Sequence, residues 1–327
     1  MKGFDNTYSE TYAIRNKRRI LCKLIAIIIL AAMLFAVVYF AVTQFNLSAD
    51  GVIGETKPNF GCFIGNVKLY SEYGILVDLS DGEVIAEKGS TRRIYPASLT
   101  KIMTALLLVE NCDDLYNTVT IPYDIYPALY EEEASMAGFE AGEEVTFEAL
   151  LYGILLPSGA ECCMTCANWV SGSESAFVEL MNEKAHTLGM NDTHFCNCTG
   201  LHEASHYSTV NDISVLLKYA LQYNSFRNAF TSSSYSVPPT DYHIDGFTFF
   251  STMFSYMDTA SVAGGEILGG KTGYTEEAGL CLASLADICG RKYVLVTAKA
   301  DGTHETQQYH ISDAFNVYNE IGGILGE

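Results

Sequence analysis

The first motif of the chain lies in the stretch Tyr95-Pro96-Ala97-Ser98-Leu99-Thr100-Lys101-Ile102-Met103-Thr104-Ala105. Apolar residues recur at helical spacing after Pro96, so the sequence predicts a long helix from about Ser98 to Val109. Ser98 would lie in its first turn, where free backbone amides favour a developing negative charge. Lys101 follows one turn later, so a desolvated amine there can take the Ser98 proton and activate a nucleophile. Taken alone, the motif also suits a serine-capped helix with a solvated lysine.

The second motif, Ser158-Gly159-Ala160, follows a proline in the predicted turn between two helices, one ending near Leu156 and one running through Trp169. A serine in such a turn can lower its hydroxyl toward Ser98 and Lys101. There it would relay a proton to a leaving amine. A plain turn serine is the alternative, because serine is common in turns.

The third motif, Lys271-Thr272-Gly273, precedes two runs rich in β-formers and is predicted to lie on an edge strand. Lys271 and Thr272 can bind a carboxylate there, and Gly273 lets a substrate backbone lie close to the strand. The amide of Tyr274 would complete an oxyanion hole with the Ser98 amide. The three motifs together predict one nucleophilic site with substrate contacts.

Strand patterns occur near both ends of the globular part, with helical patterns between them. A hairpin is expected from Tyr73 to Lys88 around Asp81-Gly82, and further strands from Leu280 to Ala286 and from Tyr293 to Ala298. Helices are expected at about residues 174–188, 210–223 and 307–321. This order predicts an α/β fold with one antiparallel sheet, closed by both ends of the sequence, and a helical lobe in the middle.

The N-terminal region carries an uncharged apolar run from Leu24 to Val42, which as a helix would span about 28 Å. Five basic residues precede the run within residues 15–23, an arrangement that keeps the N-terminus in the cytoplasm. We therefore expect a cytoplasmic tail over 1–23, a transmembrane signal anchor over 24–43, a linker over 44–66 and the functional domain over 67–327. A signal peptide cleaved near Leu47-Ser48-Ala49 is the alternative.

Charge and cysteine content restrict the partners further. The formal net charge of −20 excludes nucleic-acid binding through phosphates and favours a neutral or zwitterionic substrate. Ten cysteines are present, and nine of them follow the predicted anchor. Buried, reduced thiols are the favoured reading, and disulfides remain an alternative.

A zinc-protease pattern occurs at His202-Glu203-Ala204-Ser205-His206. It binds metal only on a helix, where histidines four residues apart share a face. Turn residues and β-branched residues flank it here, so we expect no helix. We expect neither a metal nor another cofactor.

The three motifs sit among further segments that resemble serine-type D-alanyl-D-alanine carboxypeptidases, the low-molecular-mass penicillin-binding proteins. The resemblance covers about residues 67–300 and includes Leu151-Tyr152-Gly153, Met181-Asn182-Glu183-Lys184-Ala185, Thr199-Gly200-Leu201, His206-Tyr207-Ser208-Thr209 and Lys271-Thr272-Gly273-Tyr274-Thr275. It implies a β-lactamase-like (transpeptidase) fold on the outer side of a bacterial membrane. It also implies that Ser98, with Lys101 as base, removes the terminal D-alanine of peptidoglycan stem peptides through an acyl-enzyme. β-Lactams would acylate the same serine.

The chain departs from the family pattern at several points. Ala160 stands where the second motif normally has asparagine, and Glu161 is a candidate to replace part of that contact. Residues 301–309 contain no arginine to bind the substrate carboxylate. The C-terminal β-domain of many members is expected to be absent. A catalytically weakened penicillin- or peptidoglycan-binding protein is therefore the alternative function, and a β-lactamase is a further one, disfavoured because no Glu-x-x-x-Asn segment is recognisable.

Overall fold

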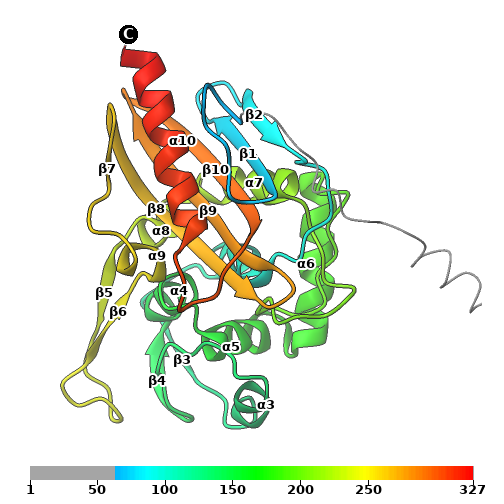
Figure 1. The fold of residues 1–327 in the computed structure, drawn as a ribbon. Coiled ribbons are helices and arrows are strands. Elements are labelled where there is room, and N and C mark those ends of the chain that lie inside the picture. Colours follow the sequence, from blue (N-terminus) through cyan, green and yellow to red (C-terminus); the bar gives the residue numbers. More distant parts are fainter. Residues whose placement is uncertain (1–62, 327) are drawn as a thin grey trace, which may run out of the picture. The chain divides into compact units, whose positions relative to one another are not determined.

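The computed structural model describes residues 63–326, and the central feature of this part is an antiparallel sheet (Figure 1). Within these residues the sheet has six strands in the order β2-β1-β10-β9-β8-β7. Their bounds are β1 Tyr73–Asp78, β2 Val84–Lys88, β7 Ser261–Val262, β8 Gly265–Thr275, β9 Gly279–Ile288 and β10 Arg291–Ala300. The early hairpin pairs with the last strand, β1 to β10, so the expected sheet closed by both ends of the sequence is confirmed.

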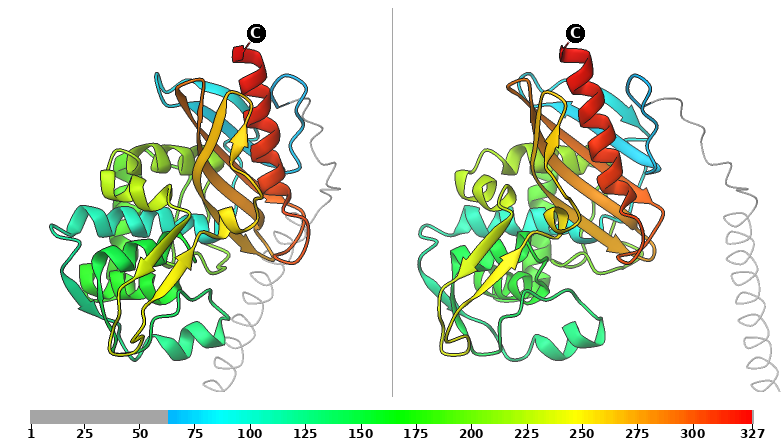
Figure 2. Two further views of the ribbon diagram at one scale, coloured as in Figure 1. Left: turned by 90° about the vertical axis from the view of Figure 1, so that its left-hand side faces the viewer. Right: turned by 60° about the vertical axis from the view of Figure 1, so that its left-hand side comes forward.

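Helices cover both faces of the sheet, which explains why its central strands are apolar on both sides. The C-terminal helix α10 (Tyr309–Gly326) packs on one face of β9 and β10, and the helical lobe lies against the other face (Figure 2). Successive side chains of β10 point to opposite faces of the sheet. Leu295 packs in the core under α10, whereas Val294 and Val296 pack in the core under the lobe.

In sequence, the lobe lies between the hairpin and the last four strands, β7 to β10. Its helices are α2 Lys101–Asn111, α3 Tyr126–Glu131, α4 Phe147–Leu155, α5 Ala160–Ser171, α6 Glu174–Leu188, α7 Val210–Ala220 and α8 Asn224–Phe230. Two small hairpins and a short helix complete it: β3 Thr118–Thr120 with β4 Glu144–Thr146, β5 Ser234–Val237 with β6 Phe247–Phe250, and α9 Thr252–Ser255. Side chains of Thr146, Ser173 and Thr209 cap α4, α6 and α7, so local sequence sets where these helices begin.

The helix predicted from Ser98 begins differently in the structure. Residues Ala97–Thr100 form a 3-10 turn, η1, and α2 begins only at Lys101. The tighter turn begins at Ala97, where the backbone has a φ of 47°, which is unusual for a residue with a side chain. Ser98 therefore lies in the first turn of a continuous helical segment, as expected, but this turn is a constrained 3-10 turn that leads directly into α2.

The predicted N-terminal elements lie outside the described residues. The tail over 1–23 and the signal anchor over 24–43 are not described, nor is the linker over 44–66 up to residue 62. In the part of the chain that the structure does describe, the helices are too short or too polar to cross a bilayer.

Candidate active site

Ser98 and Lys101 lie in a cleft of about 380 Å³ between the helical lobe and the outer part of β8. Tyr274 and His304 line it on the side of the sheet, and Ala160 lines it on the side of the lobe. Beyond the short pairing of β7 with residues 265 and 266, β8 pairs with β9 alone, so its last residues form an open edge. The expected edge strand is therefore present, and the three motifs meet around it.

The Lys101 amine lies beside the Ser98 hydroxyl. Its Nζ is 3.1 Å from Ser98 Oγ and donates a second hydrogen bond of 2.7 Å to the carbonyl oxygen of Thr199. Burial lowers the pKa of the Lys101 amine, although the charge of the Glu161 carboxylate opposes this shift. A buried amine with a lowered pKa is suited to take a proton from the neighbouring hydroxyl.

The turn at residues 197–201 supplies the carbonyl that orients Lys101. Asn197 Oδ1 accepts a hydrogen bond of 2.7 Å from the amide of Gly200 and thereby closes the turn. Gly200 has φ of 84°, and a Cβ on it would lie 1.9 Å from the carbonyl oxygen of Ala97. Only glycine therefore lets this turn press against the Ser98 segment. The three motifs carry no signal for this contact, although Thr199-Gly200-Leu201 is one of the segments that resemble the family.

The zinc-protease pattern is not helical, as expected, and its histidines have separate surroundings. His206 is buried; its Nδ1 accepts from the amide of Cys196, so Nε2 carries the proton and donates to Thr100 Oγ1 at 2.8 Å. Burial lowers the pKa of His206 to about 4, which keeps it neutral. His202, in contrast, has its Nδ1 3.6 Å from Glu277 Oε2. Across residues 63–326 no group of three possible metal ligands occurs.

Lys271 and Ser158 form a second lysine–serine pair. Lys271 Nζ donates to Ser158 Oγ at 3.0 Å and to the carbonyl oxygen of Thr272 at 2.8 Å. Burial, together with the charge of Lys101, lowers the pKa of Lys271 well below its ordinary range. Ser158 has φ of 69°, a strained conformation of the kind that clusters at functional sites. The structure thus joins the Ser158 hydroxyl to Lys271, whereas the sequence suggested that it faces Ser98 and Lys101.

The backbone of β8 passes close to the Ser98 turn at Gly273. A Cβ at Gly273 would lie 3.1 Å from the Ser98 amide nitrogen and 3.2 Å from the carbonyl oxygen of Pro96. A larger residue would push the strand away from the Ser98 turn. Because Gly273 has no side chain, the backbone amide of Ser98 can lie close to the strand that carries Tyr274.

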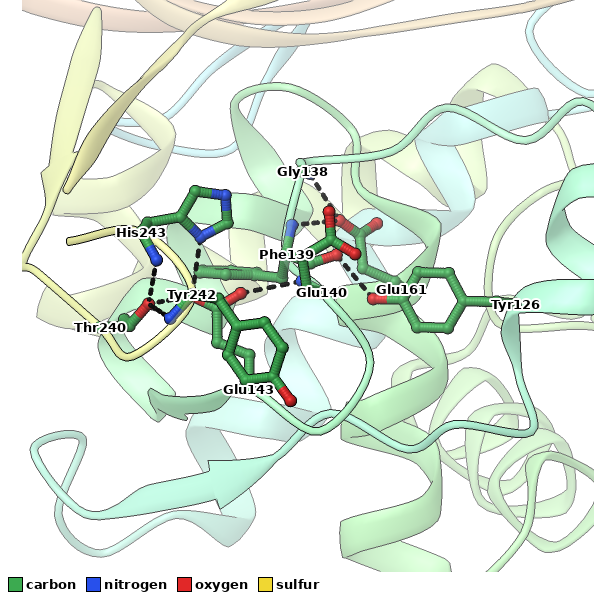
Figure 3. A network of polar contacts seen from close by, with 9 residues as sticks. All are labelled: Tyr126, Gly138, Phe139, Glu140, Glu143, Glu161, Thr240, Tyr242 and His243. Atoms are coloured by element: carbon green, nitrogen blue, oxygen red, sulfur yellow. Dashed lines mark hydrogen bonds and ion pairs between the residues drawn. The ribbon is translucent and has the colours of Figure 1, made fainter. Parts of the chain in front are cut away.

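The second motif places Ala160 and Glu161 in different surroundings. Ala160 begins α5 and lines the cleft, and its amide donates to the carbonyl oxygen of Ser135 at 2.7 Å. Glu161 turns away from the cleft: its Oε1 accepts hydrogen bonds from the amides of Ala137 and Gly138 at 2.7 and 2.8 Å (Figure 3). The side-chain hydrogen bonds of Glu161 therefore go to the wall behind the cleft, and Glu161 acts on Lys101 through its charge.

Glu161 belongs to a polar network that fixes the cleft wall from behind. Tyr126 donates to the carbonyl oxygen of Phe139, and buried Glu143 accepts from the amide of Glu140 and lies 3.0 Å from His243 Nδ1 (Figure 3). The segment at 137–143 is thus tied on one side to α5 and on the other to the loop between β5 and β6. Its preceding residues, 132–135, line the cleft, so the network holds their wall in place.

Cysteines pack around the site as small apolar groups. The eight cysteines within residues 63–326 are all free thiols. Cys162, Cys163 and Cys166 on α5 and Cys198 in the turn are fully buried, and burial raises the pKa of each of these thiols. They are therefore neutral thiols in the core beneath Lys101.

Replacement of Glu161 tests this network through stability. Glu161→Ala leaves buried amides without an acceptor and should lower the free energy of unfolding by about 3 kcal/mol, whereas Glu161→Gln keeps the acceptor oxygen. Burial raises the pKa of Glu161 above its ordinary value of 4.5. The wild type should therefore lose stability relative to Glu161→Gln as pH rises above about 4.5, because the folded carboxyl holds its proton more tightly than the unfolded one. Chemical unfolding between pH 4 and 8 measures both effects, and equal stability of Glu161→Ala and wild type would contradict the network.

Comparison with known proteins gives one consistent family. The sequence model of the D-alanyl-D-alanine carboxypeptidase family matches residues 64–302. D-alanyl-D-alanine carboxypeptidase DacF of Bacillus subtilis (strain 168) is 36% identical over 219 residues, which are 65% of this chain and 53% of DacF. The D-alanyl-D-alanine carboxypeptidase of Streptomyces sp. (strain K15) is 29% identical over 289 residues, 85% of this chain and 95% of the relative.

Solved structures agree with the sequence comparison. The crystal structure of the Streptomyces K15 DD-transpeptidase superposes with a TM-score of 0.71 and 25% identity, over 80% of this chain and all of that one. The α/β transpeptidase fold expected from the resemblance is thereby confirmed. The chain spans only about half the length of DacF and 38% of the Escherichia coli relative DacC. The match over most of this chain nevertheless establishes that it belongs to the D-alanyl-D-alanine carboxypeptidase family.

Proposed function

We propose that this protein is a serine D,D-carboxypeptidase that removes the terminal D-alanine from peptidoglycan stem peptides. The observation that carries the proposal is the Lys101 amine, 3.1 Å from the Ser98 hydroxyl and with a lowered pKa, in the wall of an open cleft. Family membership supports the same reaction. The proposed functional domain runs from residue 67 to residue 327.

Ser98 acts as the nucleophile in the first half of the reaction. Its Oγ attacks the carbonyl carbon of the last peptide bond while its proton passes to the neutral amine of Lys101. The tetrahedral intermediate collapses to an ester on Ser98 and releases D-alanine, whose amine takes up a proton. Water then attacks the ester, and the shortened peptide leaves with a restored Ser98 hydroxyl.

The second pair, Lys271 and Ser158, supplies the proton that the leaving amine takes up. Lys271 Nζ donates to Ser158 Oγ at 3.0 Å, which leaves the Ser158 proton available to an amine in the cleft. We assign Ser158 as the proton relay, with Lys271 and Thr272 contributing to the binding of the substrate terminus. The strained backbone of Ser158 fits this assignment, since such strain concentrates at functional sites.

The developing oxyanion would be held by the backbone amides of Ser98 and Tyr274. Gly273 brings the two segments together, with a Cβ position 3.1 Å from the Ser98 amide nitrogen. Paired backbone amides that are fixed before the reaction stabilise such an anion strongly. β-Lactams, which mimic the D-Ala-D-Ala terminus, would acylate Ser98 in the same place and leave slowly.

The nucleophile and base can be tested with a labelled penicillin. The wild-type chain should bind the label covalently at Ser98, and Ser98→Ala should abolish labelling because no other nucleophile replaces the hydroxyl. Lys101→Ala should slow acylation by at least about a hundredfold while the protein stays folded. Mass spectrometry of the labelled peptide and circular dichroism check these outcomes. Label that persists on Ser98→Ala would reject the assigned site.

The alanine of the second motif gives a separate test. Ala160 lines the cleft, so Ala160→Asn would present an amide to the substrate and to Lys101. The value of kcat/KM for an acyl-D-Ala-D-Ala peptide should rise about tenfold, or roughly 1.4 kcal/mol. Ser158→Ala should lower it in either background, because the relay hydroxyl is independent of that amide. Unchanged turnover by Ala160→Asn beside an active wild type would mean that the amide has no role here.

The proposed location is a bacterial membrane, with the functional domain outside. Support comes from the basic residues before the apolar run of Leu24 to Val42, which lies outside the described residues. Protease added to protoplasts should digest the domain and spare a tag at Met1. A mature N-terminus near Asp50 would instead show that the run is a cleaved signal peptide.

A further inference from the structure

A separate cavity of about 310 Å³ lies near the active-site cleft, and we call it the tyrosine-lined cavity. It is formed by the start of β1, the segment before η1, the loop at 204–207, the turn after β8 and the end of β10. The side chains on which its chemistry depends are Tyr73, Arg93, Tyr95, Tyr207, Glu277 and Lys299. None of them lines the cleft around Ser98, so the mechanism proposed above leaves this cavity without a role.

The tyrosine-lined cavity lies in the direction that a bound peptide would follow out of the cleft. In the proposed mechanism, the substrate terminus binds near Lys271 and Thr272, and the scissile carbonyl lies at the amide of Tyr274. The residues upstream of the scissile bond therefore run toward the end of β8 at Thr275. Two residues further on, Glu277 already lines the tyrosine-lined cavity.

The distance from the nucleophile suits a residue close to the D-Ala-D-Ala terminus. Tyr95 lines the cavity and lies three residues before Ser98, so their Cα atoms are at most about 11 Å apart. Two extended peptide residues span about 7 Å, and a side chain adds to that reach. Tyr95 and Glu277 both contact His202, by a ring centroid distance of 4.7 Å and a closest approach of 3.6 Å. The two walls of the cavity therefore meet at His202.

Two cationic side chains give the cavity a positive charge. The guanidinium of Arg93 lies over the ring of Tyr207, with Cζ 3.9 Å from the ring centroid. Within residues 63–326, no carboxylate lies at ion-pair distance from Arg93. Lys299 lies with its Nζ 3.9 Å from Glu72 Oε2, which is a long ion pair. The aromatic contact thus holds the Arg93 guanidinium in the cavity without neutralising its charge.

The three tyrosines supply hydrogen-bond donors beside these cations. In the described part of the chain, the hydroxyls of Tyr73, Tyr95 and Tyr207 bond to no other residue. A phenol hydroxyl can donate to a carboxylate, while its ring packs against the carbon atoms that carry that group. The lining therefore combines charge, donors and apolar walls, which are the features of a site for a small organic anion.

The cleft itself has the opposite charge. Its lining includes the carboxylates of Glu132, Glu133 and Glu276, whereas Glu277 is the one carboxylate in the lining of the tyrosine-lined cavity. The whole chain carries a formal charge of −20. An acidic group on a bound peptide would be repelled in the cleft and attracted in the tyrosine-lined cavity.

We propose that the tyrosine-lined cavity is a subsite for a side-chain carboxylate one or two residues upstream of the D-Ala-D-Ala terminus. This inference rests on the proposed function and names the class of peptide that the enzyme prefers. Arg93 and Lys299 would form charge-assisted hydrogen bonds with the carboxylate, which are stronger than bonds between neutral groups. The subsite would favour a peptide with a free upstream carboxylate over the same peptide with an amide at that position.

The experiment compares peptides that differ only in one upstream charge. The full-length chain is assayed for D-alanine release with acetyl-Glu-Ala-D-Ala-D-Ala and acetyl-Ala-Glu-D-Ala-D-Ala, and with the two peptides in which glutamine replaces the glutamate. The ratio of kcat/KM for the glutamate peptide to that for its glutamine partner isolates the upstream carboxylate. For the wild type, this ratio should be at least about five at one of the two positions, mainly through a lower KM.

Substitutions in the lining give the subsite a distinct signature. Arg93→Gln should bring the ratio close to one, and Arg93→Glu should bring it below one, because a carboxylate at this position repels the substrate. Glu277→Gln should raise the ratio, since it removes the negative charge of the lining. Arg92→Gln is the matched control, because Arg92 is exposed and is not part of the lining, and its ratio should equal that of wild type.

A wild-type ratio of one at both positions would overturn the subsite, and so would an Arg93→Gln ratio equal to that of wild type. Circular dichroism of each variant checks that it is folded. Inversion of the preference by Arg93→Glu is an outcome that a purely structural role of Arg93 does not produce.

Binding to a chain that cannot be acylated separates this inference from the proposed function. Titration calorimetry with full-length Ser98→Ala measures the affinity for each glutamate peptide and for its glutamine partner. If wild type released no D-alanine, tighter binding of a glutamate peptide that is lost when Arg93→Gln is added would support the subsite and refute the carboxypeptidase. Equal affinities would overturn the subsite, whatever the outcome for D-alanine release.

Discussion

Burial of the Lys101 amine is the constraint on which the rest of the site depends. An amine loses proton affinity when it leaves water, and only then can it take a proton from a serine near neutral pH. Three separate segments enclose it: η1 before α2, the turn at 197–201, and the first turns of α5. The close approaches at Gly200 and Gly273 are consequences of this enclosure, because a side chain at either position would force the walls apart.

The same enclosure sets the proton affinity of the two buried amines of the site. Burial lowers the pKa of both amines, and the charge of Lys101 lowers the pKa of Lys271 further. The feature that makes the amines useful for proton transfer therefore weakens them as fixed cations.

Local patterns in the sequence were sufficient for the elements that local forces determine. The hairpin at 73–88 and the helix at 174–188 follow from turn residues, capping side chains and periodicity, and the structure has them where expected. The 3-10 turn at Ser98 was not predictable in this way, because packing against Gly200 and Gly273 shapes it. The pairing of Ser158 with Lys271, 113 residues apart, and the inward turn of Glu161 likewise depend on contacts distant in sequence.

Alanine in place of the usual asparagine at position 160 has only a local effect on the structure, because other residues fix the backbone around it. Its amide bonds to the carbonyl oxygen of Ser135, and Glu161 beside it binds the amides of Ala137 and Gly138. These bonds hold the start of α5 and the lobe wall whatever side chain occupies position 160. An alanine there removes an amide from the cleft without releasing the segment that carried it. The chain has therefore kept the frame of the second motif and lost one contact within it, and this agrees with a working nucleophile and base rather than with general decay of the site.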